Sequence, residues 1–270
     1  MSGRVAVKFA YEGAEFMGSQ RQPRVRTAES ELLSALAKIG AIHSAGENRF
    51  RVASRTDRGV SALGNVFAVD TDFRRQELLS ALNAICQDVY CYAYAEVPDS
   101  FSPRRAKGRW YQYHLSYRGQ DVELMRRCAA EFQGEHEFRL FCKPDGKVTK
   151  RSLDSVEVRM EGGMIVIDLK AREFLRNMVR RIVSALDQVG RGRVSLDEVR
   201  SALQGEGRSM GLAEPEGLFL MDVDHGLDLV YGPLGQMPEK VEQARDGALV
   251  RLHYLELLQE KTHLAASSLK

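Results

Sequence analysis

The first part of the chain repeats two hydrophobic patterns, one typical of strands and one typical of helices. Apolar residues occupy alternate positions from Arg4 to Tyr11, which predicts a strand because successive strand side chains point to opposite faces. Apolar residues at helical spacing follow Thr27, which can cap a helix, and Gly40 ends that pattern. The segments that follow predict strands near 49–55 and 65–70, a helix near 74–85 and a strand near 89–97.

The same order then begins again, with one helix more. Apolar residues at helical spacing in the tail predict a further helix, packed on the second half. The predicted elements are a strand near 108–117, a helix near 122–132, strands near 152–160 and 164–170, helices near 172–189 and 196–203, a strand near 217–223 and the tail helix near 238–264.

Both series have the strand and helix order of a ferredoxin-like domain, a pattern that RNA-binding sheets often use. We therefore predict an α/β (α+β) protein of two ferredoxin-like (RNP-like) halves, residues 1–104 and 105–270. The halves are expected to form a largely antiparallel sheet with a central active-site cleft. Because this fold hosts many activities, the pattern predicts architecture and not function.

The bulk composition excludes several classes of protein. Of the 270 residues, 44% are hydrophobic and 28% are charged, which is typical of a globular chain rather than a disordered one. No run of about 18 apolar residues is present, so no membrane span is expected, and the absence of a signal-peptide pattern predicts a cytoplasmic protein. No metal site is expected, because the cysteines form no C-x-x-C pair: Cys86, Cys91, Cys128 and Cys142.

Basic residues gather in three segments, 20–26, 103–109 and 172–193, although the net charge is only +2. If these segments line one cleft, they form a track for RNA phosphates, and binding depends on salt concentration. Scattered surface charge is the alternative.

The stretch from Arg51 to Gly64 carries the clearest chemical signal. Asp57 lies between Arg55 and Arg58 in a polar turn, and neighbouring guanidinium groups favour an ionised carboxylate. A carboxylate of this kind suits nucleophilic or general-base catalysis. An ordinary turn, in which the aspartate bonds its own backbone, is the alternative interpretation.

Residues 54–66, SRTDRGVSALGNV, resemble the catalytic motif of the tRNA pseudouridine synthase A (TruA) family. The resemblance extends over about residues 4–224, because further family motifs follow in the same order at 11–22, 82–84, 101–104, 109–113, 174–180 and 216–220. Four positions depart from the family pattern and suggest an archaeal or eukaryotic-like branch: Ser19 replaces an aromatic residue, Ser54 a glycine, Asn65 a glutamine and Asn177 a histidine.

The resemblance implies an enzyme that converts uridine to pseudouridine in the anticodon stem-loop of tRNA, without metal, nucleotide or redox cofactor. It implies that Asp57 starts the reaction, that Tyr111 lies against the flipped base and that Arg180 keeps Asp57 ionised. From the residues alone, Tyr111 also fits a core position, and Arg180 fits a solvated basic stripe on the helix near 172–189.

The same resemblance implies binding partners. A homodimer is expected, with tRNA spanning both subunits. The residues expected to bind the substrate are Gln20, Arg55, Arg58, Arg104, Arg109, Leu175 and Arg176.

Two other functions stay open from the sequence: a non-catalytic RNA-binding module and a synthase of the same family with another RNA target. A zinc-dependent base deaminase is disfavoured, because the H-x-E and C-x-x-C signatures are missing. A phosphate-transfer enzyme is disfavoured by the lack of a G-x-x-x-x-G-K-[ST] loop.

Overall fold

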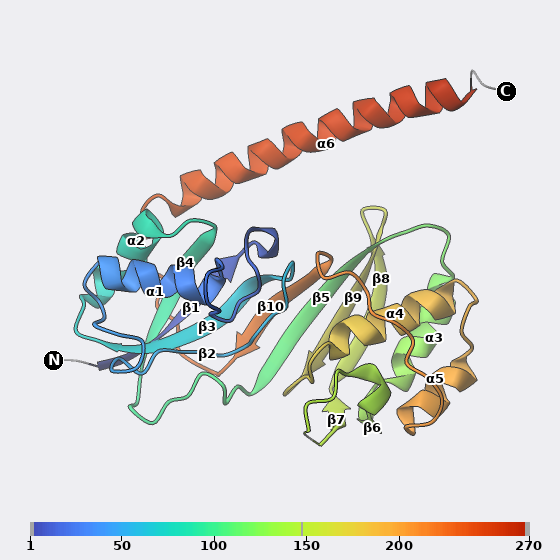
Figure 1. Cartoon of the computed structure of the whole chain (residues 1–270), viewed down its shortest axis with the longest axis horizontal. Coiled ribbons are helices and arrows are strands. Elements are labelled where there is room, and N and C mark those ends of the chain that lie inside the picture. Colours follow the sequence, from blue (N-terminus) through green and yellow to red (C-terminus); the bar gives the residue numbers. More distant parts are fainter. Residues whose placement is uncertain (1–2, 147, 268–270) are drawn as a thin grey trace.

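The computed structural model describes residues 3–146 and 148–267, which form a mixed α/β protein around one long sheet (Figure 1). The first series contains four strands and two helices, close to the predicted order. They are β1 (Gly3–Tyr11), α1 (Ala28–Lys38), β2 (Arg51–Val52), β3 (Ser61–Thr71), α2 (Arg75–Ile85) and β4 (Val89–Val97).

The second series contains the predicted elements and two additional short strands that pair with each other, β6 and β7. Its elements are β5 (Gly108–Ser116), α3 (Val122–Glu131), β6 (Gly134–Glu137), β7 (Lys150–Leu153), β8 (Ser155–Glu161), β9 (Met164–Ala171), α4 (Met178–Gly190), α5 (Leu196–Leu203), β10 (Leu218–Asp224) and α6 (Met237–Ser267).

The predicted pair of ferredoxin-like halves is confirmed. The first half has the strand order β4-β1-β3-β2 and the second half β10-β5-β9-β8, with antiparallel neighbours within each half. The two halves join where Phe219 and Leu220 of β10 pair in parallel with Ser61 and Ala62 at the start of β3. The exact division between residues 104 and 105 stays a prediction, because the halves share one sheet.

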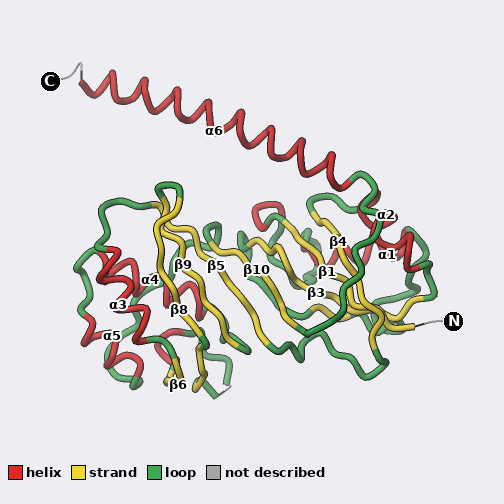
Figure 2. Tube along the Cα trace, turned by 180° about the vertical axis from the view of Figure 1, so that it is seen from behind, coloured by secondary structure: helices red, strands yellow, loops and turns green. Residues whose placement is uncertain are grey.

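The helices α1 to α4 cover one face of this sheet, as the opposite views in Figures 1 and 2 show. On that face, buried residues of β1 such as Val7 and Phe9 belong to one core with Leu32 and Leu36 of α1. On the other face, the segment 225–236 runs across the first half, where Val230 exchanges two backbone hydrogen bonds with Tyr94 of β4 (Figure 2).

The tail corrects one prediction. It is helical, but it does not pack on the second half: α6 starts beside α2 of the first half and extends away from the body (Figure 1). Lys240 anchors its start by donating to the carbonyl groups of Asn83 and Cys86. Every side chain from Val241 to Thr262 is exposed. The apolar spacing therefore predicted the helix correctly and its packing wrongly.

Two other boundaries differ from the predictions. The strand expected near 49–55 is reduced to the two residues of β2, so residues 53–60 form a loop before β3. The helix expected near 172–189 begins only at Met178, so Arg172 and Arg176 lie in a loop and not on a helical stripe with Arg180. Backbone groups in this loop bond elsewhere, as Arg176 accepts a hydrogen bond from the amide of Lys143 at 2.8 Å.

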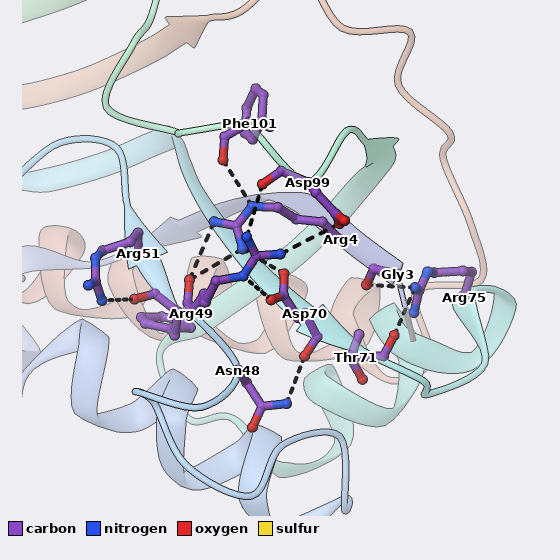
Figure 3. A network of polar contacts seen from close by, with 11 residues as sticks. Gly3, Arg4, Asn48, Arg49, Arg51, Asp70, Thr71, Arg75, Asp99 and Phe101 are labelled. Carbon is purple, nitrogen blue, oxygen red and sulfur yellow. Dashed lines mark hydrogen bonds and ion pairs between the residues drawn. The ribbon is translucent and has the colours of Figure 1, made fainter. Parts of the chain in front are cut away.

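A network of arginines holds the far end of β3 to the segment that links the halves (Figure 3). The carboxylate of Asp70 pairs with Arg4 at 2.7 Å and with Arg49. Arg4 also donates to the carbonyl of Phe101 at 2.9 Å, and Arg49 donates to that of Asp99 at 3.1 Å. The network therefore fixes the start of the linker that leads into β5.

Candidate active site

A cavity of about 900 Å³ lies between the loop before β3 and the loop before α4. Six separate parts of the chain line it, so only the folded chain can form it: 17–22, 52–60, 104–111, Asp145 with Arg151, 173–180 and Leu218. All ten residues predicted for the site are among the lining residues: Gln20, Arg55, Asp57, Arg58, Arg104, Arg109, Tyr111, Leu175, Arg176 and Arg180.

The loop that carries Asp57 is held by contacts within the first half. Ser19 brackets Thr56: its hydroxyl accepts from the Thr56 amide at 2.7 Å, and its amide donates to the Thr56 carbonyl at 3.2 Å. The hydroxyl groups of Tyr11 and Thr56 are 2.7 Å apart. Gly13 is required nearby, because a Cβ there would lie 2.3 Å from the backbone of Val60. The loop is therefore positioned before any substrate binds.

Asn65 ties the base of the same loop to β3. Its side chain accepts from the amide of Ser54 at 3.2 Å and donates to the carbonyl of Ser54 at 2.9 Å, in a buried position. Ser19, Ser54 and Asn65 are three of the positions that depart from the family pattern. In this chain they support the loop that carries Asp57, a role that nothing in their local sequence indicated.

Arg180 reaches across the cavity to Asp57. Its Nη1 lies 3.3 Å from Oδ2 of Asp57, and its Nε donates to the carbonyl of Ala213 at 2.7 Å. The side chain of Arg180 is 12% exposed, whereas that of Asp57 is 35% exposed. Arg180 is thus not a solvated surface residue: the second half fixes it and aims it at a carboxylate that remains accessible.

Tyr111 lies on β5 at the inner end of the cavity and is only 8% exposed. Its ring meets that of Phe174 edge to face, with centroids 5.1 Å apart. Burial raises the pKa of Tyr111 well above its usual value, and the charge of Asp57 raises it further. Tyr111 is therefore both a packed residue and a neutral phenol on the cavity wall.

The outer part of the cavity is strongly basic. Its lining contains eight arginines against three carboxylates, which favours an anionic ligand. Five exposed guanidinium groups there make no hydrogen bond or ion pair with any other described residue: those of Arg21, Arg55, Arg58, Arg104 and Arg176. They are free to bind phosphate groups.

Sequence reasoning missed several lining residues. Arg151 of β7 lines the cavity and lies 3.7 Å from Glu173, and neither residue belongs to a motif. Phe174 begins the family motif at 174–180 and is not among the predicted site residues, although it lines the cavity and packs on Tyr111. A basic residue on a short strand carries no local signal, so only the tertiary structure could identify Arg151.

The described residues offer neither a metal site nor a membrane span. They contain no group of three histidine, cysteine, aspartate or glutamate side chains arranged to hold a metal ion. Nor do they contain a helix long and apolar enough to cross a membrane.

Comparisons with known proteins now identify the family. The family of tRNA pseudouridine synthases matches residues 128–225. Three archaeal relatives, each named tRNA pseudouridine synthase A, extend the match. The relative from Pyrococcus abyssi is 43% identical over 226 residues, which are 82% of this chain and 84% of the relative.

A relative from Pyrococcus furiosus is 38% identical over 271 residues and covers 98% of this chain and 96% of its own length. One from Methanosarcina mazei is 39% identical over 231 residues, with 84% and 86% covered. Because these matches span most of both chains at this identity, the chain belongs to the tRNA pseudouridine synthase A family.

Proposed function

We propose that this chain converts uridine to pseudouridine in the anticodon stem-loop of tRNA, with Asp57 as the catalytic carboxylate. The observation that carries the proposal is the contact between Asp57 and Arg180 inside an arginine-lined cavity. A carboxylate that faces a fixed guanidinium, yet is 35% exposed, is available to a substrate.

The reaction is an isomerisation that leaves the composition of the nucleotide unchanged. The glycosidic bond from the sugar to the ring nitrogen breaks, the base turns, and a bond from the sugar to a ring carbon forms. That carbon loses a proton, and the freed nitrogen gains one. A uridine inside a stem must first leave its stack, which costs a few kcal/mol.

The cavity offers the chemical groups that such a substrate needs. The ring of Tyr111 can stack against the flipped base, a contact worth about 1–3 kcal/mol. Because its pKa is raised, Tyr111 stays protonated at neutral pH and can donate a hydrogen bond. The free arginines at the outer part of the cavity can bind the phosphates on either side of the flipped nucleotide.

The assembly is also part of the proposal. We expect a homodimer that binds one tRNA across both subunits, and light scattering during gel filtration can measure its mass. The cytoplasmic location expected from the sequence stays a prediction.

The test is the variant Asp57→Asn, with Asp72→Asn as matched control because Asp72 is exposed. We expect Asp57→Asn to lower turnover at least about 1,000-fold, which corresponds to roughly 4 kcal/mol of transition-state stabilisation. Asp72→Asn should keep the wild-type rate. Binding of tRNA should persist in both variants, because the arginines are unchanged.

Mapping of pseudouridine in tRNA that has been treated with each protein gives both the rate and the modified nucleotide. Wild-type turnover by Asp57→Asn would show that Asp57 is not the catalytic residue. Modification of another RNA instead of tRNA would contradict only the assignment of tRNA as the substrate. Binding without any turnover by the wild-type protein would favour the non-catalytic RNA-binding module.

A further inference from the structure

Arg109 differs from the other arginines around the cavity, because each of its three guanidinium nitrogens bonds to another part of the protein. Nε donates to the hydroxyl of Ser54 at 3.0 Å, and Nη2 donates to the carbonyl of Arg104 at 3.2 Å. Nη1 donates to the carbonyl of Arg172. These acceptors lie in the loop before β3, the linker between the halves and the loop before α4.

Such a side chain is poorly suited to bind a phosphate. A phosphate would have to displace protein acceptors that already occupy the guanidinium, whereas Arg104 and Arg176 have no acceptor within the described residues. Arg109 is half-buried, and this burial lowers its pKa. Its neighbour Tyr111 partly offsets this shift.

We propose that Arg109 is a positioning residue that sets the distance between Asp57 and Arg180 across the cleft. The proposal rests on the proposed function. Arg109 lies two residues before Tyr111 on β5 and holds one loop from each half. Both walls of the cavity are therefore held by one side chain of the same strand, β5.

Ser54 is the connection to the catalytic loop. It is buried three residues before Asp57, and its backbone is bonded at both its amide and its carbonyl by Asn65. A displacement of Ser54 is therefore transmitted to Asp57. The family pattern commonly has glycine here, so the hydroxyl that receives Arg109 is a feature of this chain. Misplacement of reacting groups by about 1 Å can cost on the order of 100-fold in rate.

The experiment compares Arg109→Lys, Ser54→Ala and the double variant. Arg74→Lys serves as control, because Arg74 is 81% exposed and, within the described part of the chain, its side chain pairs only with Glu77. We expect kcat to fall about 30-fold in Arg109→Lys and about 5-fold in Ser54→Ala, since the single nitrogen of a lysine cannot reach three acceptors that lie in separate segments. The double variant should be no slower than Arg109→Lys, because both changes break the same bond.

Two further measurements separate positioning from phosphate binding. The slope of log affinity for tRNA against log salt concentration should stay at the wild-type value in Arg109→Gln, which removes the positive charge that Arg109→Lys keeps. Amide hydrogen exchange of residues 54–60 should speed up about 10-fold in Arg109→Lys and in Ser54→Ala, without any RNA present.

A decrease in the salt slope by about one in Arg109→Gln, with kcat unchanged, would show a phosphate ligand and overturn the proposal. Additive losses in the double variant, or unchanged amide exchange, would also overturn it. If Arg109→Lys fails to fold, Ser54→Ala alone decides by kcat and exchange. The exchange result does not depend on turnover, so it stands apart from any failure of the proposed function.

Discussion

The two ends of β3 each carry an aspartate that faces arginine, but the two sites are built differently. Asp57 lies four residues before the strand starts at Ser61, and Asp70 is its penultimate residue. Eleven strand residues separate the ends by roughly 30 Å, so the two sites do not interact directly. They can be compared as a site for chemistry and a site for structure.

Asp70 has both carboxylate oxygens occupied. Arg4 binds one oxygen and Arg49 the other, and Asn48 bonds the backbone of Asp70 at both its amide and its carbonyl (Figure 3). The Arg4 side chain is only 4% exposed. A substrate has no access to such a carboxylate without breaking the first half.

Asp57 receives one guanidinium nitrogen, at 3.3 Å from one oxygen, and its other oxygen has no partner within the described residues. Asp70 is held through its own carboxylate. Asp57 is held instead through the neighbouring backbone, to which Ser19 and Asn65 form hydrogen bonds. The difference teaches that a fixed loop can carry a carboxylate with one oxygen left without a hydrogen-bond partner. It also teaches that the pairing of an aspartate with arginine does not by itself identify a catalytic residue.

After Asp57→Asn, the largest expected effect is on stability. Asp70→Asn leaves Arg4 buried without its counter-charge, so the free energy of unfolding should fall by about 3 kcal/mol. Urea denaturation measures this change. The folded fraction should keep the wild-type kcat, because Asp70 lies far from the cavity. A variant of wild-type stability and reduced kcat would reverse the roles assigned to the two ends of β3.

Arg180→Lys should lower kcat strongly and stability less, the opposite of Asp70→Asn. The charge is kept, but a lysine cannot bond both the carbonyl of Ala213 and the carboxylate of Asp57 through separate nitrogens. We expect kcat to fall about 100-fold, equal to roughly 2.7 kcal/mol, with a smaller change in stability than in Asp70→Asn. Single-turnover kinetics with tRNA give the rate, and a rate within 3-fold of wild type would contradict the pairing role.

The pH dependence of stability offers a further separation. Burial raises the pKa of Asp70, but hydrogen bonds from Arg49 and Arg4 outweigh burial and lower it overall. A lowered pKa stabilises the fold above the unfolded value of about 3.9, and this stabilisation is lost as pH falls through the folded pKa.

Wild-type protein and Asp70→Asn should therefore differ most near neutral pH and converge below about pH 4. Urea denaturation at a series of pH values measures the difference, and other acidic groups cancel in the subtraction. A difference that stays constant down to pH 2.5, a value chosen about one unit below the unfolded pKa, would show that Asp70 acts through packing and not through its charge.

The smallest expected effect is at the outer part of the cavity. Arg104→Gln removes a guanidinium that has no protein acceptor within the described residues, so affinity for tRNA should fall only a few-fold at moderate salt. The salt slope of binding should decrease by about one. An unchanged slope would mean that this arginine does not contact phosphate.

The sequence by itself determined the local elements and the candidate chemistry of this protein. Alternating and helical spacing of apolar residues predicted both ferredoxin-like series, because this periodicity depends only on which face of each element is buried. The family motifs pointed to Asp57, Tyr111 and Arg180, and these residues line one cavity.

Only the tertiary structure decided where the elements pack, which arginine contacts Asp57 and which arginine bonds the cavity walls. Apolar spacing extended the helix near 172–189 too far, because it cannot reveal that backbone groups of residues 172–177 bond to distant segments. The same spacing could not reveal that α6 stands clear of the second half.

The contact between Asp57 and Arg180 joins residues 123 positions apart, and it exists because β10 pairs with both β3 and β5. Local patterns can predict a strand, but the position of a strand in a sheet depends on every element that competes for the same edge. For this reason the sequence predicted the members of the site, and only the assembled sheet separated Arg180, which faces Asp57, from Arg109, which holds the walls together.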